Sequence, residues 1–454
     1  MTLPDGPKTL PFLQLIQWIA NPLALLETSR QRYGDPFTLR LGSFAPLVFF
    51  SNPQAIQEIF TAQPNQFDTG RANGILRPLV GDQSLLLLDG DRHQRQRRLL
   101  TPPFHGDRMK SYGQLICDIT QQVISQWTIG EPFSVRSSMQ DISFQVILQA
   151  VFGLNEGQRC EQLKQLLPAM LDVAGSPLSS SLLFFRILQQ DLGAWSPWGH
   201  FVRQRQQIDE ILYAEIAERR QQADLSRTDI LSLLMSARDQ NGQPMTDAEL
   251  RDELMTLLTA GHETTASALS WALYWIHSLP EVHHKLLQEL DAFDDADLSG
   301  IAKLPYLSAV CQETLRIYPI AMLAFARVVK SPFQLMGYDL EPNTLLAPCI
   351  YLTHHREDLY PEPKLFKPER FLERQYSTYE YLPFGGGNRR CIGVALALFE
   401  MKLVLATILS RSQLQLVENS QVKPMRRGVT LAPSGGKWLV ATSQRQKAKM
   451  PVQV

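Results

Sequence analysis

The chain has 454 residues, of which 44% are hydrophobic and 20% are charged, and its formal net charge is −1. This composition is typical of a globular protein with a large core, and the near-zero charge argues against a nucleic-acid-binding protein. The five cysteines are scattered without a Cys-x-x-Cys pair, which argues against a zinc site and a disulfide framework.

The N-terminal part predicts no membrane anchor. Residues 12–26 are apolar only in patches, because Gln14, Gln17 and Asn21 interrupt them. A signal peptide or a spanning helix needs a longer unbroken apolar run. Together with the cysteine usage, this predicts a cytoplasmic protein.

The first 84 residues predict a small β region. Residues 37–41 and 46–50 are separated by a Gly-Ser turn and predict a hairpin. Pro53 can begin a helix over about 53–62, since proline is tolerated in the first turn. Residues 64–84 are rich in Gly, Pro and Asn and predict a loop.

The middle of the chain predicts a helix-rich body, residues 91–320, to which residues 390–410 are added. Within it, residues 165–190 predict two helices joined by a soft connection. Residues 201–222 are polar and predict a solvated helix.

One predicted helix is unusually long. Thr246 and Glu249 have the spacing of a capping box, and nothing breaks the helical pattern before Ser278. About 32 residues at about 1.5 Å each give a helix of about 48 Å, which would cross the whole molecule.

The last third predicts two further helices and more strands. The helices are expected at 281–294 and 305–318, and the strands at 333–351 and 428–442, with a hairpin signal at 434–436. Strands from opposite ends of the chain are expected to pair. The predicted fold is mainly α with minor β sheets, in a single domain of residues 1–454.

Residues 384–393, Phe-Gly-Gly-Gly-Asn-Arg-Arg-Cys-Ile-Gly, place a cysteine just before a helical run that ends near Leu409. Glycines let a backbone turn tightly and approach a flat ligand closely. The positive end of the helix and the arginines favour a thiolate at Cys391. One chemistry with this need is the axial ligation of haem iron. A phosphate-binding loop is not indicated, since Gly-x4-Gly-Lys-Ser/Thr is absent.

The spacing of Phe384, Gly387, Arg389, Cys391 and Gly393 resembles the haem-binding loop of the cytochrome P-450 family, the haem-thiolate monooxygenases. The resemblance covers nearly the whole chain and is strongest for the soluble bacterial, particularly cyanobacterial, members near the fatty-acid-hydroxylating branch. It implies haem b (iron protoporphyrin IX), with Cys391 as the metal ligand and Phe384 and Arg389 beside the haem.

Residues 260–265, Ala-Gly-His-Glu-Thr-Thr, lie in the middle of the long helix. A glycine there costs about 1 kcal/mol relative to alanine, so Gly261 needs a reason, and room for a macrocycle or dioxygen beside Ala260 is one. The segment resembles the family motif in which an acid and an alcohol deliver protons to bound oxygen. The resemblance implies Glu263 and Thr264 as catalytic residues; a plain polar helix face is the alternative.

Glu313 and Arg316 lie at i and i+3, a spacing that is common in surface pairs. With Arg370 in the run Pro-Glu-Arg-Phe, they match the family's Glu-x-x-Arg motif and its second arginine. The resemblance implies a buried network behind the cysteine loop with a structural role.

Four basic residues are candidates for binding the two haem propionates. His93 and Arg97 lie at i and i+4 on one helix, where the alternatives are a solvated basic face or a docking face for an acidic partner. Arg327 and Arg389 match family positions for the same role.

The resemblance implies hydroxylation of an apolar substrate such as a long-chain fatty acid or a terpenoid, with dioxygen and with electrons from an external ferredoxin and its ferredoxin reductase. The candidates for substrate contact are apolar: residues 67–79, 166–185, Leu257 with Ala260, 320–325 and 431–432. Two loop arginines, Arg71 and Arg77, are candidates for binding a substrate carboxylate. Candidates for ferredoxin docking are Arg97, Arg98, Arg108, Lys110 and Arg390. Three alternatives stay open: a peroxygenase of the same fold, a haem protein that senses gas or carries electrons, and a Cys–His hydrolase.

Overall fold

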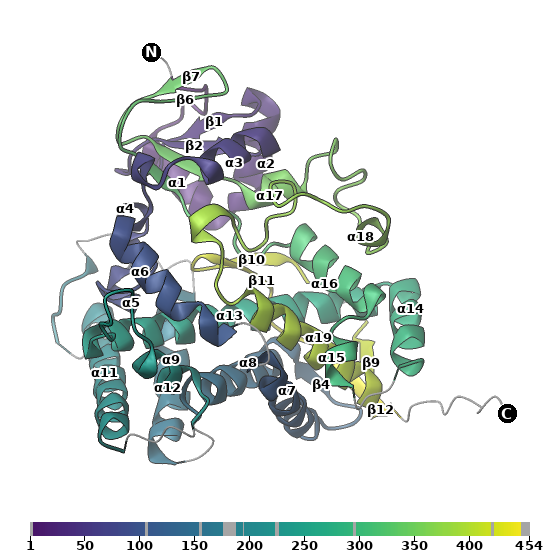
Figure 1. The fold of residues 1–454 in the computed structure, drawn as a ribbon. Coiled ribbons are helices and arrows are strands. Elements are labelled where there is room, and N and C mark those ends of the chain that lie inside the picture. Colours follow the sequence, from purple (N-terminus) through teal and green to yellow (C-terminus); the bar gives the residue numbers. More distant parts are fainter. Residues whose placement is uncertain are drawn as a thin grey trace.

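The computed structural model describes residues 3–104, 108–153, 157–175, 188–193, 195–222, 227–293, 297–418 and 422–445. Helices dominate, and the small sheets gather mainly at two places (Figure 1). The predicted class, mainly α with minor β sheets, is confirmed.

The long helices form most of the body. Their bounds are α1 (Pro11–Ala20), α2 (Pro22–Tyr33), α3 (Pro53–Thr61), α6 (Gly90–Leu100), α7 (Arg108–Ile124), α8 (Val135–Phe152), α9 (Gln158–Gly175), α11 (Pro197–Gln222), α12 (Ile230–Ser236), α13 (Asp247–Ser278), α14 (Pro280–Asp291), α16 (Pro305–Ile317) and α19 (Val394–Arg411). Shorter helices are α4 (Thr69–Ala72), α5 (Arg77–Val80), α15 (Leu298–Ile301), α17 (Ile350–His354) and α18 (Arg370–Glu373).

One sheet joins distant parts of the chain next to α1, α2 and α3 (Figure 1). Its strand order is β1-β2-β8-β5-β3, and β2 pairs in parallel with β8. The predicted pairing between the first and last thirds is therefore confirmed. The bounds are β1 (Phe37–Leu39), β2 (Leu47–Phe50), β3 (Phe67–Asp68), β5 (Arg327–Val329) and β8 (Leu345–Pro348), with β6 (Phe333–Leu335) and β7 (Tyr338–Leu340) as a separate hairpin.

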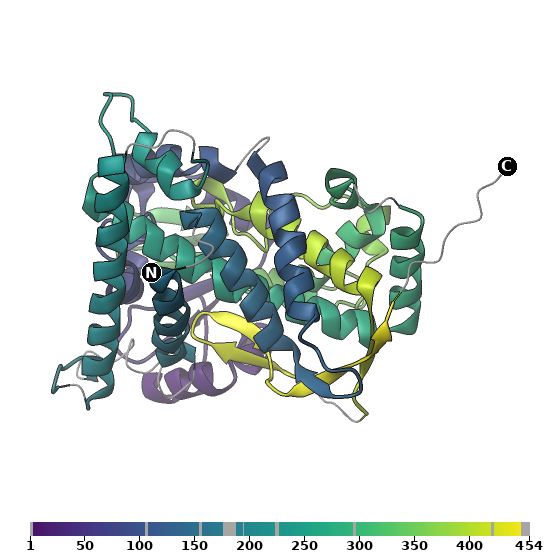
Figure 2. The same cartoon turned by 90° about the horizontal axis from the view of Figure 1, so that it is seen from below.

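The C-terminal strands form a second β region. Here β12 (Lys437–Gln444) lies between β4 (Pro132–Ser134) and β9 (Ser412–Leu416), while β10 (Pro424–Arg427) pairs with β11 (Thr430–Pro433). Figure 2 shows these yellow strands at one edge of the body, beside the blue segment that contains β4. The hairpin predicted at 434–436 is wrong, because this turn leads from one sheet to another.

The helix α13 is the axis of the core. The capping box at Thr246 and Glu249 is present, and the helix has the predicted length of 32 residues. Most of its side chains are buried, and it packs against α8 and α19, which also contribute to the largest hydrophobic cluster.

Two predictions about secondary structure need correction. The segment 201–222 belongs to α11 and buries seven side chains along one face, so it is not a solvated helix. The predicted loop 64–84 contains the short elements β3, α4 and α5.

Of the two helices predicted over 165–190, the first is the end of α9 and the second falls outside the described residues. No helix within the described residues is long and apolar enough to cross a membrane.

Candidate active site

The loop before α19 is built around a tight turn that ends at Cys391. The Cys391 N–H donates to the Phe384 carbonyl at 3.0 Å, and Gly385 and Gly387 adopt φ angles of +65° and +63°, which favour glycine. A Cβ on Gly386 would lie 2.3 Å from the Phe60 ring. The middle glycine thus makes room for Phe60 of α3, which sequence reasoning did not foresee.

Cys391 differs from the other four cysteines, because they are buried whereas Cys391 is exposed. Desolvation raises the pKa of the Cys391 thiol, while an N–H group of Gly393 and the charges of Arg97 and Arg390 lower it. Cys391 is thus exposed as a residue, yet enough protein surrounds its thiol for desolvation to raise the pKa. A cation held at the sulfur would complete the stabilisation of a thiolate.

Behind this loop lies the predicted ion-pair network. Glu313 accepts from Arg316 at 2.6 and 2.9 Å and from Arg370 at 3.1 Å, and the side chains of Glu313 and Arg316 are fully buried. Arg316 also donates to the carbonyls of His354 and Pro363. The network is buried inside the protein, as predicted.

His354 connects the network to the cysteine loop. Its Nδ1 lies 3.2 Å from the Arg316 carbonyl oxygen, and its Nε2 accepts from the Leu382 N–H at 3.0 Å. This pattern requires a neutral ring with the proton on Nδ1. Burial and the Arg316 charge hold the pKa of His354 well below its usual value of 6.5. No motif or spacing in the sequence pointed to His354.

A group of basic side chains converges on the other side of the loop. His93 is 2% exposed, and its pKa falls to about 3 because of burial and of the charges of Arg389, Arg97 and Arg327. Desolvation, followed by Arg389, lowers the pKa of Arg327 to about 9. Among the described residues, His93 Nε2 has no hydrogen-bond partner. Buried positive groups that face one another in this way suit an anion.

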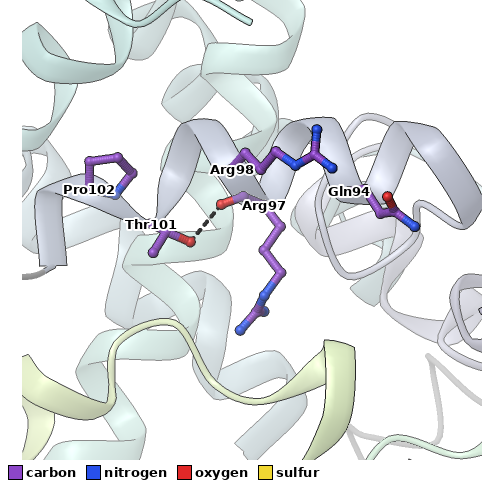
Figure 3. A pocket seen from close by; sticks show the side chains of 5 residues that line it. All are labelled: Gln94, Arg97, Arg98, Thr101 and Pro102. Atoms are coloured by element: carbon purple, nitrogen blue, oxygen red, sulfur yellow. Dashed lines mark hydrogen bonds between the residues drawn. The ribbon is translucent and has the colours of Figure 1, made fainter. Parts of the chain in front are cut away.

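Within this group of basic side chains, Arg97 and Arg389 have different surroundings. Arg97 extends from α6 away from Arg98 and lines a hollow of about 420 Å³ (Figure 3). Arg389 donates to the carbonyls of Leu85 and Leu88 and to Asp89 at 2.6 Å. Asp89 also accepts from two backbone N–H groups of α4. Asp89 thus holds Arg389 in place, a role that sequence reasoning missed.

The middle of α13 carries a stripe that is not buried, which we call the exposed stripe. It consists of Leu257, Ala260 and Thr264 on one face of the helix, where Ala260 is exposed and the other two are half-buried, although most of α13 is buried. The Thr264 Oγ1 donates to the Ala260 carbonyl at 2.5 Å. A hollow over this stripe would bring a ligand to the Thr264 hydroxyl.

Glu263 and Gly261 turn instead towards α8. Glu263 pairs with Arg136 at 2.7 Å and accepts from Gln140 at 2.9 Å. A Cβ on Gly261 would lie 2.8 Å from the Cδ1 of Ile147. The missing side chain of Gly261 thus allows close packing of α8 on α13, a reason that sequence reasoning missed, while the expected room for a macrocycle beside Ala260 stays a prediction.

The substrate-contact candidates lie in different surroundings. Leu431 and Ala432 are fully buried and belong to the core. Arg71 donates to Asn343 and Arg77 pairs with Asp82, so both loop arginines have partners. Residues 176–185 lie outside the described residues. The exposed stripe of α13 remains the best-supported candidate.

The family model "Cytochrome P450" matches residues 4–440. This chain belongs to the cytochrome P450 family. It is 38% identical over 437 residues to cytochrome P450 135B1 of Mycobacterium tuberculosis (strain ATCC 25618 / H37Rv), an alignment that covers 96% of this chain and 90% of the relative. Cytochrome P450 135A1 of the same strain is 35% identical over 454 residues, which cover 98% of this chain and 96% of the relative.

Two solved structures share the fold of this cytochrome P450. The structure "Retinoic acid bound cyanobacterial CYP120A1" aligns with a TM-score of 0.81 and 26% identity, covering 98% of this chain and 100% of that one. The "cytochrome P450DA heme domain" aligns with a TM-score of 0.82 and 24% identity, covering 98% of both chains.

Cytochromes P450 are haem-thiolate monooxygenases that bind haem b, which settles the class of enzyme and sets aside the sensor and hydrolase alternatives. The residues present fit this cofactor. The Nε2 of His93 has no hydrogen-bond partner in the part of the chain that the structure describes and, with Arg97, Arg327 and Arg389 around it, suits the two propionates. The exposed Cys391 suits the iron.

Proposed function

We propose that this cytochrome P450 uses dioxygen and two electrons to hydroxylate a long apolar substrate, such as a fatty acid or a terpenoid. The observation that carries the proposal is the exposed stripe of α13, where the apolar Leu257 and Ala260 lie on the same face as Thr264, whose hydroxyl donates to the Ala260 carbonyl. The relative of 26% identity was solved with retinoic acid bound, and retinoic acid is a long apolar acid of terpenoid origin. This supports a substrate of the same class here.

We assign the haem contacts residue by residue. Cys391 would ligate the iron, and Phe384, Ala260 and Gly261 would contact the haem. The propionates would be held by His93, Arg97, Arg327 and Arg389. When bound, haem supplies the reductive activation of dioxygen. The protein supplies the ligand, the orientation and the exclusion of water.

Thr264 and Glu263 would manage the protons. Because the Thr264 hydroxyl donates to the Ala260 carbonyl, its oxygen can accept a further hydrogen bond from a group above the stripe. Glu263 lies next to Thr264 but is paired with Arg136, so it delivers protons only when that pair opens. This acid and alcohol favour dioxygen over the peroxygenase alternative.

Electrons would come from an external ferredoxin and its reductase. Arg98 and Arg390 are exposed near the cysteine loop, and Arg97 lines the hollow beside them (Figure 3). These charges suit an acidic partner. The side chains of Arg108 and Lys110, also predicted for this face, lie outside the described residues.

Substrate binding tests the proposal most simply. Retinoic acid and palmitic acid, titrated into the ferric enzyme, should displace the water ligand and shift the Soret band to shorter wavelength. Leu257→Trp should weaken the shift by filling the space over the stripe, whereas Leu431→Ile, in the core, should not. The absence of any shift with both acids would contradict the substrate class. Faster turnover with hydrogen peroxide than with ferredoxin and its reductase would favour the peroxygenase.

A further inference from the structure

The first helix of the chain presents apolar side chains outward. In α1, Phe12, Leu13 and Ile16 are 59%, 46% and 45% exposed, on the side opposite to the buried Trp18. The helix contains no charged residue, and of its exposed residues Gln17 alone is polar. Because the outward side of a surface helix is normally polar, a helix that is apolar on both sides indicates an interaction surface.

Two turns extend this surface at the two ends of α1. A backbone N–H of the turn after β1 donates to the Pro11 carbonyl at 3.0 Å, which places this turn, with the exposed Phe44, at the start of the helix. At the other end, Arg426 of β10 donates to the Trp18 carbonyl at 3.4 Å, and Val429 is exposed in the turn between β10 and β11. Figure 2 shows the purple N-terminal helices beside this yellow hairpin. We call the exposed apolar residues of α1, of its N-cap and of these turns the apolar face: Leu10, Phe12, Leu13, Ile16, Phe44 and Val429.

Charged side chains lie at the rim of the apolar face. Lys8, two residues before Leu10, is exposed, and so is Arg40, whose backbone N–H donates to the Gln14 side chain at 2.9 Å. Asp5 is also exposed, so the rim of these three charged residues has a net positive charge. Basic groups around apolar side chains suit a surface with anionic headgroups above acyl chains. A two-fold contact between copies of the chain places the same patch of each copy against the other, so it would instead bring two positive rims together.

The hairpin of β10 and β11 connects the apolar face with the interior. Behind the exposed Val429, the Leu431 N–H donates to the Ile320 carbonyl at 2.8 Å, and the Leu431 carbonyl accepts from the Trp271 indole of α13 at 3.2 Å. The segment 320–325 is a candidate for substrate contact, so a substrate dissolved in lipid would reach the enzyme on the side where this segment lies. The supply of substrate from lipid rests on the apolar substrate class proposed above, whereas the docking itself does not.

We propose that the apolar face docks this cytochrome P450 reversibly on an anionic lipid bilayer, with α1 in the plane of the interface. The helix has 10 residues. At about 1.5 Å each they extend about 15 Å, half the thickness of a hydrocarbon core, so α1 lies on the membrane and does not span it. Phe12 and Ile16 enter the headgroup region, while Lys8 and Arg40 pair with lipid phosphates.

Sedimentation of the holoenzyme with vesicles tests the docking without substrate. The enzyme should pellet with vesicles of phosphatidylglycerol and phosphatidylcholine, and several-fold less with phosphatidylcholine alone or at raised ionic strength. Ile16→Asn should lower the pelleted fraction several-fold. Leu372→Asn is the matched control and should bind like the wild type, because Leu372 is an exposed apolar residue of α18 outside the apolar face.

The reduced, carbon-monoxide-bound spectrum of both variants should match the wild type, which checks that they fold. Lys8→Glu, outside the helix, tests the docking if Ile16→Asn does not fold, and it should weaken binding to the anionic vesicles. Equal sedimentation of Ile16→Asn and Leu372→Asn, or no sedimentation of the wild type, would overturn the proposal. Equally strong binding to phosphatidylcholine alone would overturn the choice of an anionic surface.

Light scattering of the lipid-free enzyme distinguishes a second copy from lipid. A dimer that Ile16→Asn dissociates would assign the apolar face to self-association and overturn the proposal, whereas a monomer in both supports it. The substrate class fails separately: if retinoic acid and palmitic acid leave the Soret band unshifted while the vesicles still bind the enzyme, the docking stands without the proposed substrate.

Discussion

The Thr264 hydroxyl donates its single proton in a hydrogen bond to the Ala260 carbonyl oxygen, 2.5 Å away. Its lone pairs are therefore left to accept from a group above the stripe, and a side chain without this oxygen cannot do so. Glu263 is engaged with α8 at the same time. At the scale of single residues, the proposed proton delivery therefore depends on the hydrogen-bond partners of Thr264 and Glu263.

Thr264→Ala should lower coupled product formation by on the order of a hundredfold or more while haem binding is kept, since a general acid–base contribution is lost. The product and the hydrogen peroxide formed per electron supplied by ferredoxin measure this. Thr259→Ala is the matched control, because Thr259 bonds back to Met255 in the same helix in the same way. Equal losses in both variants would show that the effect comes from the helix and not from the hydroxyl at 264.

His354 predicts a dependence of stability on pH. The folded chain keeps His354 neutral, so below its ordinary pKa of 6.5 the unfolded chain binds a proton that the folded chain does not. The stability linked to His354 is therefore present above pH 6.5 and is lost as the pH falls, by up to about 1.4 kcal/mol per unit.

Denaturant unfolding at pH 7 and pH 5.5 measures this loss. His354→Gln should reduce it, because glutamine can bond to both backbone partners without titrating. The same substitution at the exposed His200 should not alter the loss. An unchanged slope in His354→Gln would contradict the account.

At the scale of elements, the same i,i+3 spacing has opposite consequences in two helices. Glu313 and Arg316 are fully buried in α16 and join α18 and the cysteine loop, whereas Glu161 and Lys164 form a largely exposed pair in α9. Buried pairs are costly to break, because the remaining charge has no solvent.

Glu313→Gln should therefore lower the free energy of unfolding by about 3–5 kcal/mol and weaken haem retention, since two arginines lose their carboxylate. Glu161→Gln should change it by less than about 0.5 kcal/mol. Denaturant unfolding and the haem-to-protein absorbance ratio measure both effects. Comparable changes in the two variants would mean that the network does not support the loop.

The sequence allowed the elements with local signals to be predicted. The capping box of α13, the prolines that begin α3 and α16, and the β1–β2 hairpin all depend on neighbouring residues. The misread helix α11 shows the limit, because its buried face includes the polar Gln204 and Glu215, and Glu215 pairs with Arg159 of α9 only in the folded chain.

The residues of the candidate site differ in the same way, because some have a local sequence signal and others do not. Cys391 and Thr264 lie in short motifs, so their positions could be predicted. The supports of these residues come from other elements: Asp89 holds Arg389, His354 holds Leu382, and α8 holds α13. Contacts of this kind leave no spacing pattern in one sequence.

At the scale of the whole molecule, strands from both ends share one sheet, and the largest hydrophobic cluster draws on residues from Leu85 to Ala441. The exposed charges of Arg98 and Arg390, near Cys391, act at longer range than these packing contacts. Their attraction for an acidic partner should be screened over about 10 Å at 0.1 M salt.

Reduction of the enzyme by an acidic ferredoxin should therefore slow as ionic strength rises, and Arg98→Glu should slow it at low salt. Arg40→Glu, an exposed arginine at the N-terminal sheet, is the control of equal charge change and should have little effect. Stopped-flow spectroscopy measures the rates. Rates that do not depend on salt would exclude electrostatic docking on this face.

The central claim is that Cys391 ligates the haem iron as a thiolate. The most direct measurement is the absorption spectrum of the reduced, carbon-monoxide-bound enzyme, for the wild type and for Cys391→Ala, with Cys160→Ala as a control at a buried cysteine. We predict a strongly red-shifted Soret band in the wild type and in the control, and its loss in Cys391→Ala. A band at the position typical of histidine ligation in the wild type, or the same red-shifted band in Cys391→Ala, would contradict the account.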